Sequence, residues 1–69
     1  MPLIYADVND ELIIKRLQGD LKSKQHLENL GFVVGSNIRI ISKIGENFII
    51  RVKDSRVAVS RELASKIFI

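Results

Sequence analysis

The sequence has no cysteine and only one histidine among its 69 residues. Without thiols the chain can form neither a disulfide nor a thiolate metal site, so packed apolar side chains must supply its stability. A chain of this length has room for one domain and buries only about 60% of the surface that its unfolded form exposes. Apolar residues make up 46% of the chain, which indicates a real core and argues against disorder.

Long apolar runs are also missing. No stretch approaches the roughly 20 residues that a helix needs to cross a bilayer. The first eight residues lack the basic region and the long apolar region of a signal peptide. We therefore expect a cytoplasmic protein. Its charge is modest, with 11 Lys and Arg against 8 Asp and Glu for a net charge of +3. That charge suits an acidic protein surface, anionic lipid or nucleic acid about equally, so it selects no partner.

Alternating β-branched residues predict a mainly β chain with one or two short helices. Strands are expected over residues 11–17, 36–44, 48–53, 56–59 and 67–69. Five short strands in so few residues favour a small closed barrel over a sandwich, because closure removes exposed edges. This barrel domain takes residues 11–69, and residues 1–10 form an N-terminal arm that either frays or packs against it.

Two helices are expected between the strands. The first covers residues 21–30 and should end in a left-handed cap at Gly31, with Leu27 packed against Phe32 just beyond it. The second is a single turn over residues 61–66 with Ser60 as its N-cap.

The strand over residues 36–44 has the clearest alternation of the chain. Strict alternation turns Ile38, Ile40 and Ile44 inward and leaves Arg39, Ile41 and Lys43 outward. Ile13, Ile41 and Ile49 then lie on the side that alternation leaves to water. Either the small barrel and its helix cover these three isoleucines, or they contribute to an exposed patch for a partner.

The segment formed by Leu27, Leu30-Gly31-Phe32 and Gly35 resembles the L-x-x-L-G-[apolar]-x-x-G signature of the FeoA-like family. The closing residues 58–69 are similar to that family's last strand, short helical turn and final strand. The resemblance runs without a gap from residue 11 to residue 69. It departs from the family pattern in loops, where Val34, Gly45-Glu46-Asn47 and Ser60 stand in place of a frequent proline, Gly-Asp-Pro and arginine.

The resemblance implies an SH3-like β-barrel that serves as a cytosolic accessory or regulatory protein of ferrous iron uptake. Its partner would be the cytosolic part of FeoB, the membrane ferrous-iron transporter, and the protein would meet the membrane only through that partner. The alternative is a free-standing transition-metal-binding module related to the C-terminal domain of metal-dependent repressors. A monomer or a weak homo-oligomer is expected, with no required cofactor and with Fe2+ as the candidate metal.

The residues themselves do not indicate an enzyme. There is no nucleophile with a nearby base and no Gly-rich phosphate loop. His26 and Glu28 are the candidate metal ligands, but the sequence has no H-x-x-H or E-x-x-H spacing. A solvated surface histidine is therefore the simpler interpretation.

One connection is apolar where a loop should be polar, and we place the partner-binding surface there. Its residues are Leu30, Phe32, Val33 and Val34, to which the resemblance adds Arg61. A basic face is also expected on the central strands, from Arg39, Lys43, Arg51, Lys53 and Arg56. It lacks the interleaved aromatic residues that stack on bases, so we expect no binding of nucleic acid.

Overall fold

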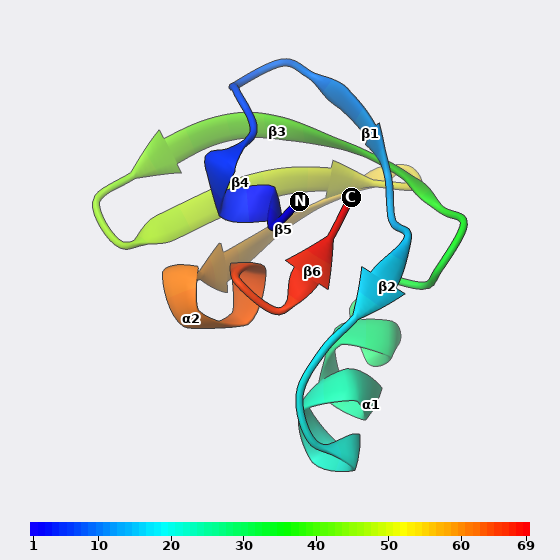
Figure 1. Cartoon of the computed structure of the whole chain (residues 1–69). Coiled ribbons are helices and arrows are strands. Elements are labelled where there is room, and N and C mark those ends of the chain that lie inside the picture. The colour runs from blue at the N-terminus through cyan, green and yellow to red at the C-terminus, as the bar shows by residue number, and fades with distance from the viewer.

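Two antiparallel sheets and two short helices make up the fold in the computed structural model, which describes residues 1–69 (Figure 1). In chain order the elements are the 3-10 helix η1 (Leu3–Tyr5), β1 (Glu11–Ile13), β2 (Arg16–Leu17), α1 (Leu21–Asn29), β3 (Asn37–Ile44), β4 (Asn47–Val52), β5 (Ser55–Ser60), α2 (Arg61–Ala64) and β6 (Ile67–Phe68). One sheet has the order β1-β3-β4-β5 and the other pairs β2 with β6. The mainly β class with two short helices is confirmed.

The strand predicted over residues 11–17 divides into two strands that belong to different sheets. β1 pairs with β3, and β2 pairs with β6. Between them Ile14 is buried, and its amide donates to the Ser36 carbonyl at 3.0 Å, while the next amide, of Lys15, donates to the Phe68 carbonyl at 2.8 Å. A strand that switches sheets makes a corner between them. The structure therefore has six strands where the alternation predicts five.

The core consists of 14 buried apolar residues and no buried polar residue. It lies between the two sheets and takes Leu27 from α1 and Ala64 from α2. The N-terminal arm belongs to this core, because Leu3 and Ala6 are buried. Its first residue is paired to the last, since the Met1 amino group donates to the Ile69 carbonyl at 3.0 Å and the Ile69 amide donates back at 2.8 Å. The termini therefore lie side by side, and the arm packs instead of fraying (Figure 1).

A β-bulge interrupts the alternation of β3. Ile40 is paired with Ile50, but Ser42 is paired with Ile49, so Ile41 is an extra residue on β3. Beyond the bulge the two faces of the strand are exchanged. The prediction that Ile44 points inward is therefore wrong, since it is 64% exposed, and Lys43 instead stands opposite the buried Phe48.

Lys43 uses this position to hold the N-terminal arm. Its ammonium lies 5.4 Å from the centroid of the Phe48 ring. It donates to the Ala6 carbonyl at 2.5 Å and more distantly to the Ile4 carbonyl at 3.4 Å, at the C-terminal end of η1. A cation close to unpaired carbonyls is stabilising, so Lys43 leaves the predicted basic face and becomes part of the fold.

Replacing this lysine should loosen the arm. We expect Lys43→Met to lower the free energy of unfolding by about 1–2 kcal/mol, because a charge-assisted hydrogen bond is lost while the apolar stem is kept. Urea titration measures the loss. Lys22→Met, at an exposed site on α1 with no hydrogen bond, is the matched control and should stay within about 0.5 kcal/mol of wild type. Equal effects of the two substitutions would contradict the role given to Lys43.

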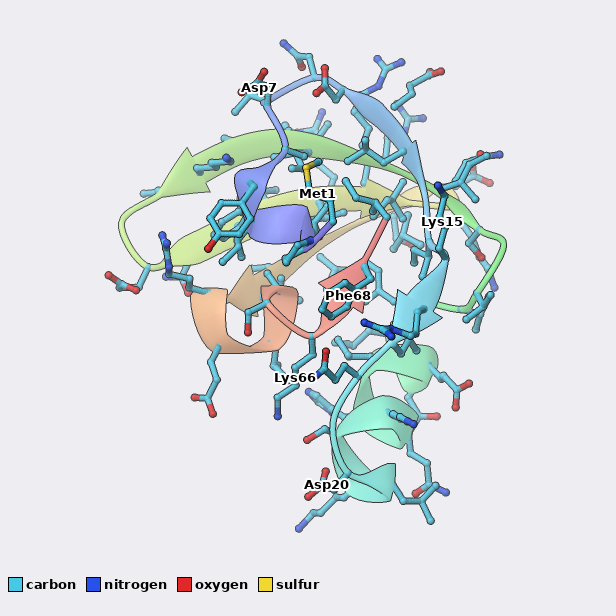
Figure 2. All side chains as sticks on the ribbon, viewed as in Figure 1. Met1, Asp7, Lys15, Asp20, Lys66 and Phe68 are labelled. Atoms are coloured by element: carbon cyan, nitrogen blue, oxygen red, sulfur yellow. The ribbon has the colours of Figure 1, made fainter.

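The start of α1 is capped by Asp20. Its Oδ1 accepts a hydrogen bond from the Ser23 amide at 2.9 Å, and Lys66 Nζ donates to Ser23 Oγ at 3.1 Å from the turn before β6 (Figure 2). The hydrogen bond from the Ser23 backbone, together with contributions from the Ser23 side chain and the Lys66 charge, lowers the pKa of Asp20 below its ordinary value. This group joins α1 to the C-terminal strand.

A lowered carboxyl pKa gives stability that is present above the pKa of the unfolded chain, about 3.9 for aspartate, and is lost as pH falls toward the pKa of the folded state. Asp20→Asn keeps an oxygen acceptor for the cap but cannot titrate. The difference in unfolding free energy between wild type and this variant should therefore shrink as the pH is lowered from 6 to 2. Urea titrations across this range test it, and a difference that does not change with pH would refute it.

Candidate functional site

The end of α1 fixes the connection that the sequence marks as a partner-binding surface. The Gly31 amide donates to the Glu28 carbonyl and the Phe32 amide to the Leu27 carbonyl, both at 3.0 Å. Gly31 has φ +105°, and Leu27 and Phe32 are both fully buried. These are the two hydrogen bonds and the apolar contact of a Schellman motif, so the predicted cap is confirmed.

Residues of this connection, which we call the apolar loop (residues 30–35), divide between core and surface. Phe32 is fully buried, so its side chain supports the loop from within and presents nothing to a partner. Leu30 and Val33 are half-buried, and Val34 is 62% exposed. The Gly35 amide donates to the Ile14 carbonyl at 2.8 Å, so the loop is attached to the barrel at both ends. Val34 is thus a large apolar side chain held in water by a fixed backbone.

The three isoleucines outside the alternation have different surroundings. Ile41 and Ile49 are half-buried, whereas Ile13 is 54% exposed. Ile13 of β1 is paired with Asn37 of β3. Asn37 comes three residues after Val34 in the chain. An exposed apolar residue therefore lies on β1 close to where the apolar loop enters β3.

Arg61 does not join the apolar loop. Its amide donates to the Glu46 carbonyl at 2.7 Å, which places it beside the turn before β4. Gly31 lies against Val52 at the other end of β4. In Figure 1 the start of α2 and the connection from α1 to β3 are accordingly on opposite sides of the molecule.

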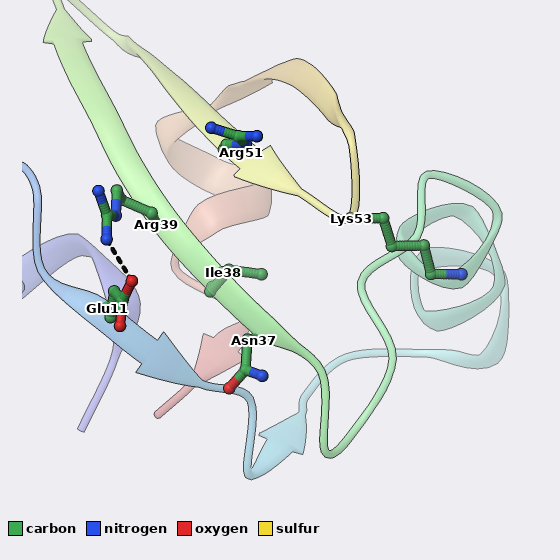
Figure 3. Close-up of a pocket in the computed structure, with 6 residues that line it drawn as sticks. All are labelled: Glu11, Asn37, Ile38, Arg39, Arg51 and Lys53. Carbon is green, nitrogen blue, oxygen red and sulfur yellow. Dashed lines mark hydrogen bonds and ion pairs between the residues drawn. The ribbon is translucent and has the colours of Figure 1, made fainter.

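A polar groove of about 370 Å³ opens on the outward face of the larger sheet (Figure 3). We call it the basic groove, and its lining residues are Glu11, Asn37, Ile38, Arg39, Arg51 and Lys53. Arg39 forms an ion pair with Glu11 on the neighbouring strand. Arg51 and Lys53 have no acidic partner, so the groove carries an excess of positive charge. No aromatic residue lines it.

His26 and Glu28 are exposed on α1 and are two residues apart, a spacing that puts side chains on different sides of a helix. No group of three or more His, Cys, Asp or Glu side chains in the structure is arranged to hold a metal ion. The two candidate ligands therefore lack the partners that a first-row transition metal requires. None of the helices has the length and apolar character to cross a membrane.

These features define a small barrel whose distinctive chemistry is on its surface, and the comparisons place it in a family. The FeoA domain model matches residues 1–69, so the chain belongs to the FeoA family. A Methanocaldococcus jannaschii protein described as Fe(2+) transport protein A is 32% identical over 68 residues, which cover 99% of this chain and 83% of the relative.

Solved structures agree with this assignment. A crystal structure of an iron uptake regulatory protein, FeoA, superposes with a TM-score of 0.90 at 25% identity, covering 97% of this chain and 91% of that one. The zinc complex of Stenotrophomonas maltophilia FeoA, described as a procaryotic SH3 domain protein, gives 0.85 at 25% identity, with 99% and 87% covered. The predicted SH3-like barrel is confirmed.

The same barrel occurs in larger proteins. A manganese-dependent transcriptional repressor matches with a TM-score of 0.89 at 14% identity, and the match covers 97% of this chain but 39% of the repressor. At this identity the likeness concerns the fold alone. The kinship with a domain of metal-dependent repressors that the resemblance implies is therefore a kinship of architecture.

We expect the left-handed conformation of Gly31 to be needed for the apolar loop to keep its shape. A Cβ there would meet Val52 methyls at 3.5 and 3.6 Å, which is ordinary contact, so the penalty for Gly31→Ala comes from the positive φ. We expect a loss of about 1–2 kcal/mol in unfolding free energy, with amide shifts concentrated in residues 30–35. Asn29→Ala, at the exposed last residue of α1 and two positions before Gly31, should be nearly neutral. A Gly31→Ala protein as stable as Asn29→Ala would contradict this account of the cap.

Proposed function

We propose that this protein is a non-catalytic accessory protein of ferrous iron uptake that docks on the cytosolic part of the membrane transporter FeoB and regulates it. Membership of the FeoA family and the likeness to an Fe(2+) transport protein A support the role in iron transport. Docking is supported by a single observation, the exposure of Val34 in a connection that hydrogen bonds hold at both ends.

An exposed apolar side chain on a fixed loop is suited to binding because its backbone loses little entropy when a partner covers it. Val34 would be the centre of the contact, with Val33 and Leu30 at its edge and Phe32 as the buried support. Arg61 would meet only a partner that extends to the other end of β4. The protein would act in the cytoplasm as a monomer or weak homo-oligomer and reach the membrane through the transporter.

Metal binding, the alternative function, has less support in this chain. The Stenotrophomonas relative was crystallised with zinc. Here His26 and Glu28 diverge on α1 and have no third ligand. Ferrous iron is then the cargo of the transporter, and this protein requires no bound metal to dock.

The docking role can be tested with two matched substitutions. Val34→Asp places a charge at the centre of the proposed contact, whereas Ile44→Asp places the same charge at a residue of similar exposure, 64% against 62%, in the turn region at the other end of the sheet. We expect Val34→Asp to weaken binding to the cytosolic part of the cognate transporter by about tenfold or more, a loss of about 1.4 kcal/mol. Ile44→Asp should change the dissociation constant by less than about twofold.

Isothermal calorimetry gives both constants, and an amide NMR titration shows whether shifts concentrate in residues 30–35. Two results would overturn the proposal. One is no binding by the wild-type protein at concentrations up to the millimolar range; the other is equal weakening by both substitutions.

A further inference from the structure

One row of side chains crosses all four strands of the larger sheet at a single register. Glu11 of β1 is paired with Arg39 of β3, Arg39 with Arg51 of β4, and Arg51 with Arg56 of β5. We call the three arginines the arginine row. Arg39 and Arg51 also line the basic groove, and Figure 3 shows them on neighbouring strands.

The row holds two like-charged pairs in direct cross-strand positions. Such pairs are destabilising in an antiparallel sheet, whereas opposite charges in the same positions are stabilising. Only the pair of Arg39 with Glu11 is compensated, because it is the one ion pair of the structure. Arg51 and Arg56 are exposed, and neither has an acidic partner. Asp54 lies in the turn beside Lys53 and forms no ion pair with the row.

Nothing in the fold uses the charges of Arg51 and Arg56. The core contains no polar residue, so the three arginines satisfy no buried group. Lys43, which the fold uses to hold the N-terminal arm, has been moved to the other face of the sheet by the bulge. The unpaired charge of Arg51 and Arg56 is therefore available to a ligand of opposite charge.

We infer that the arginine row binds an acidic helical segment of a protein partner. Neighbouring strands are about 4.8 Å apart, so the three guanidinium groups start from positions that repeat at this distance. Carboxylates three or four residues apart on a helix have Cβ atoms about 5–6 Å apart, which is a close match. A guanidinium also binds a carboxylate through two parallel hydrogen bonds. The inference rests on the proposed docking function for its choice of partner, the transporter's cytosolic part.

The apolar residues beside the row favour a polypeptide over a phosphate ligand. The next row on the same face contains the half-buried Ile49, paired with the exposed Ala58 of β5. An amphipathic helix could place apolar side chains there while its carboxylates meet the arginines. A nucleic acid would instead need aromatic stacking platforms, and none lines the groove.

The test compares two double substitutions that remove the same charge. Arg51→Gln with Arg56→Gln removes the uncompensated part of the row. The control is Lys15→Gln with Lys22→Gln. It removes two exposed charges, one just before β2 and one on α1. The variant with Arg51→Gln and Arg56→Gln should keep or raise the urea midpoint, because the cross-strand repulsion is relieved. It should still weaken binding to the transporter's cytosolic part by about tenfold.

Each protein is titrated with four probes. Two are polypeptides: the cytosolic part of the transporter, and a synthetic amphipathic helix with glutamates three and four residues apart. The other two, inorganic phosphate and phosphatidylserine vesicles, are anionic controls. We expect the peptide to shift the backbone amide signals of residues 51 and 56 and of their neighbours on β4 and β5 in the wild-type protein and in the control, and to leave the same amide signals unshifted in the row variant. Rising salt should weaken binding less in the row variant.

The outcomes separate this inference from the docking proposal. If the wild-type protein binds the transporter and both double substitutions weaken it equally, the arginine row is not a docking site while the docking function stands. If the transporter does not bind but the peptide shifts the row, the docking proposal fails and the acidic-helix specificity is kept. A response to phosphate or to vesicles as strong as that to the peptide would overturn the inference.

Discussion

The rest of the structure depends on the hydrogen bonds of the backbone at Ile14. Its amide donates to Ser36 and its carbonyl accepts from Gly35, while the next amide, of Lys15, donates to Phe68. One dipeptide therefore joins the four-stranded sheet, the two-stranded sheet and the apolar loop. The Ile14 side chain is buried between the sheets, so the same residue also supplies core volume. The chain is too short for a second core. The Ile14–Lys15 dipeptide, where the chain passes from one sheet to the other, encloses the single core that it has.

The hydrogen bonds at Ile14 also fix the geometry of the apolar loop on the surface. Because the Gly35 amide is bonded to the Ile14 carbonyl and Phe32 is a buried member of the Schellman motif, the backbone of the apolar loop is held at both ends. Val34 can then be exposed without the loop collapsing onto the barrel. The arginine row is held in the same way, by cross-strand pairing and not by contacts between its side chains. Both surfaces thus combine a hydrogen-bonded backbone with exposed side chains, Val34 on one and Arg51 and Arg56 on the other, that the core does not use.

Local patterns were sufficient for most of the fold. The cap at Gly31, the N-cap at Ser60 and the meander from β3 to β5 are short-range features with their own residue signatures. The bulge at Ile41 has no such signature, because Ile40 and Ile41 are alike and either could be the inward residue. One extra residue exchanged the faces of Lys43 and Ile44. The first predicted strand is divided because β2 pairs with the distant β6. Residues 11–17 carry no local pattern that predicts this pairing.

The candidate site divides along the same line. Sequence indicated the apolar loop but could not tell that Phe32 is inside and Val34 outside, since both are apolar neighbours in one connection. It indicated a basic face but not a row, because a row exists only once the register of four strands is known. The arginines were visible as isolated outward residues, and their meaning comes from direct opposition, which is a property of pairing alone. Like charges at paired positions oppose the sheet that carries them. A barrel with no buried polar group can bear that opposition because most of its stability comes from the apolar core.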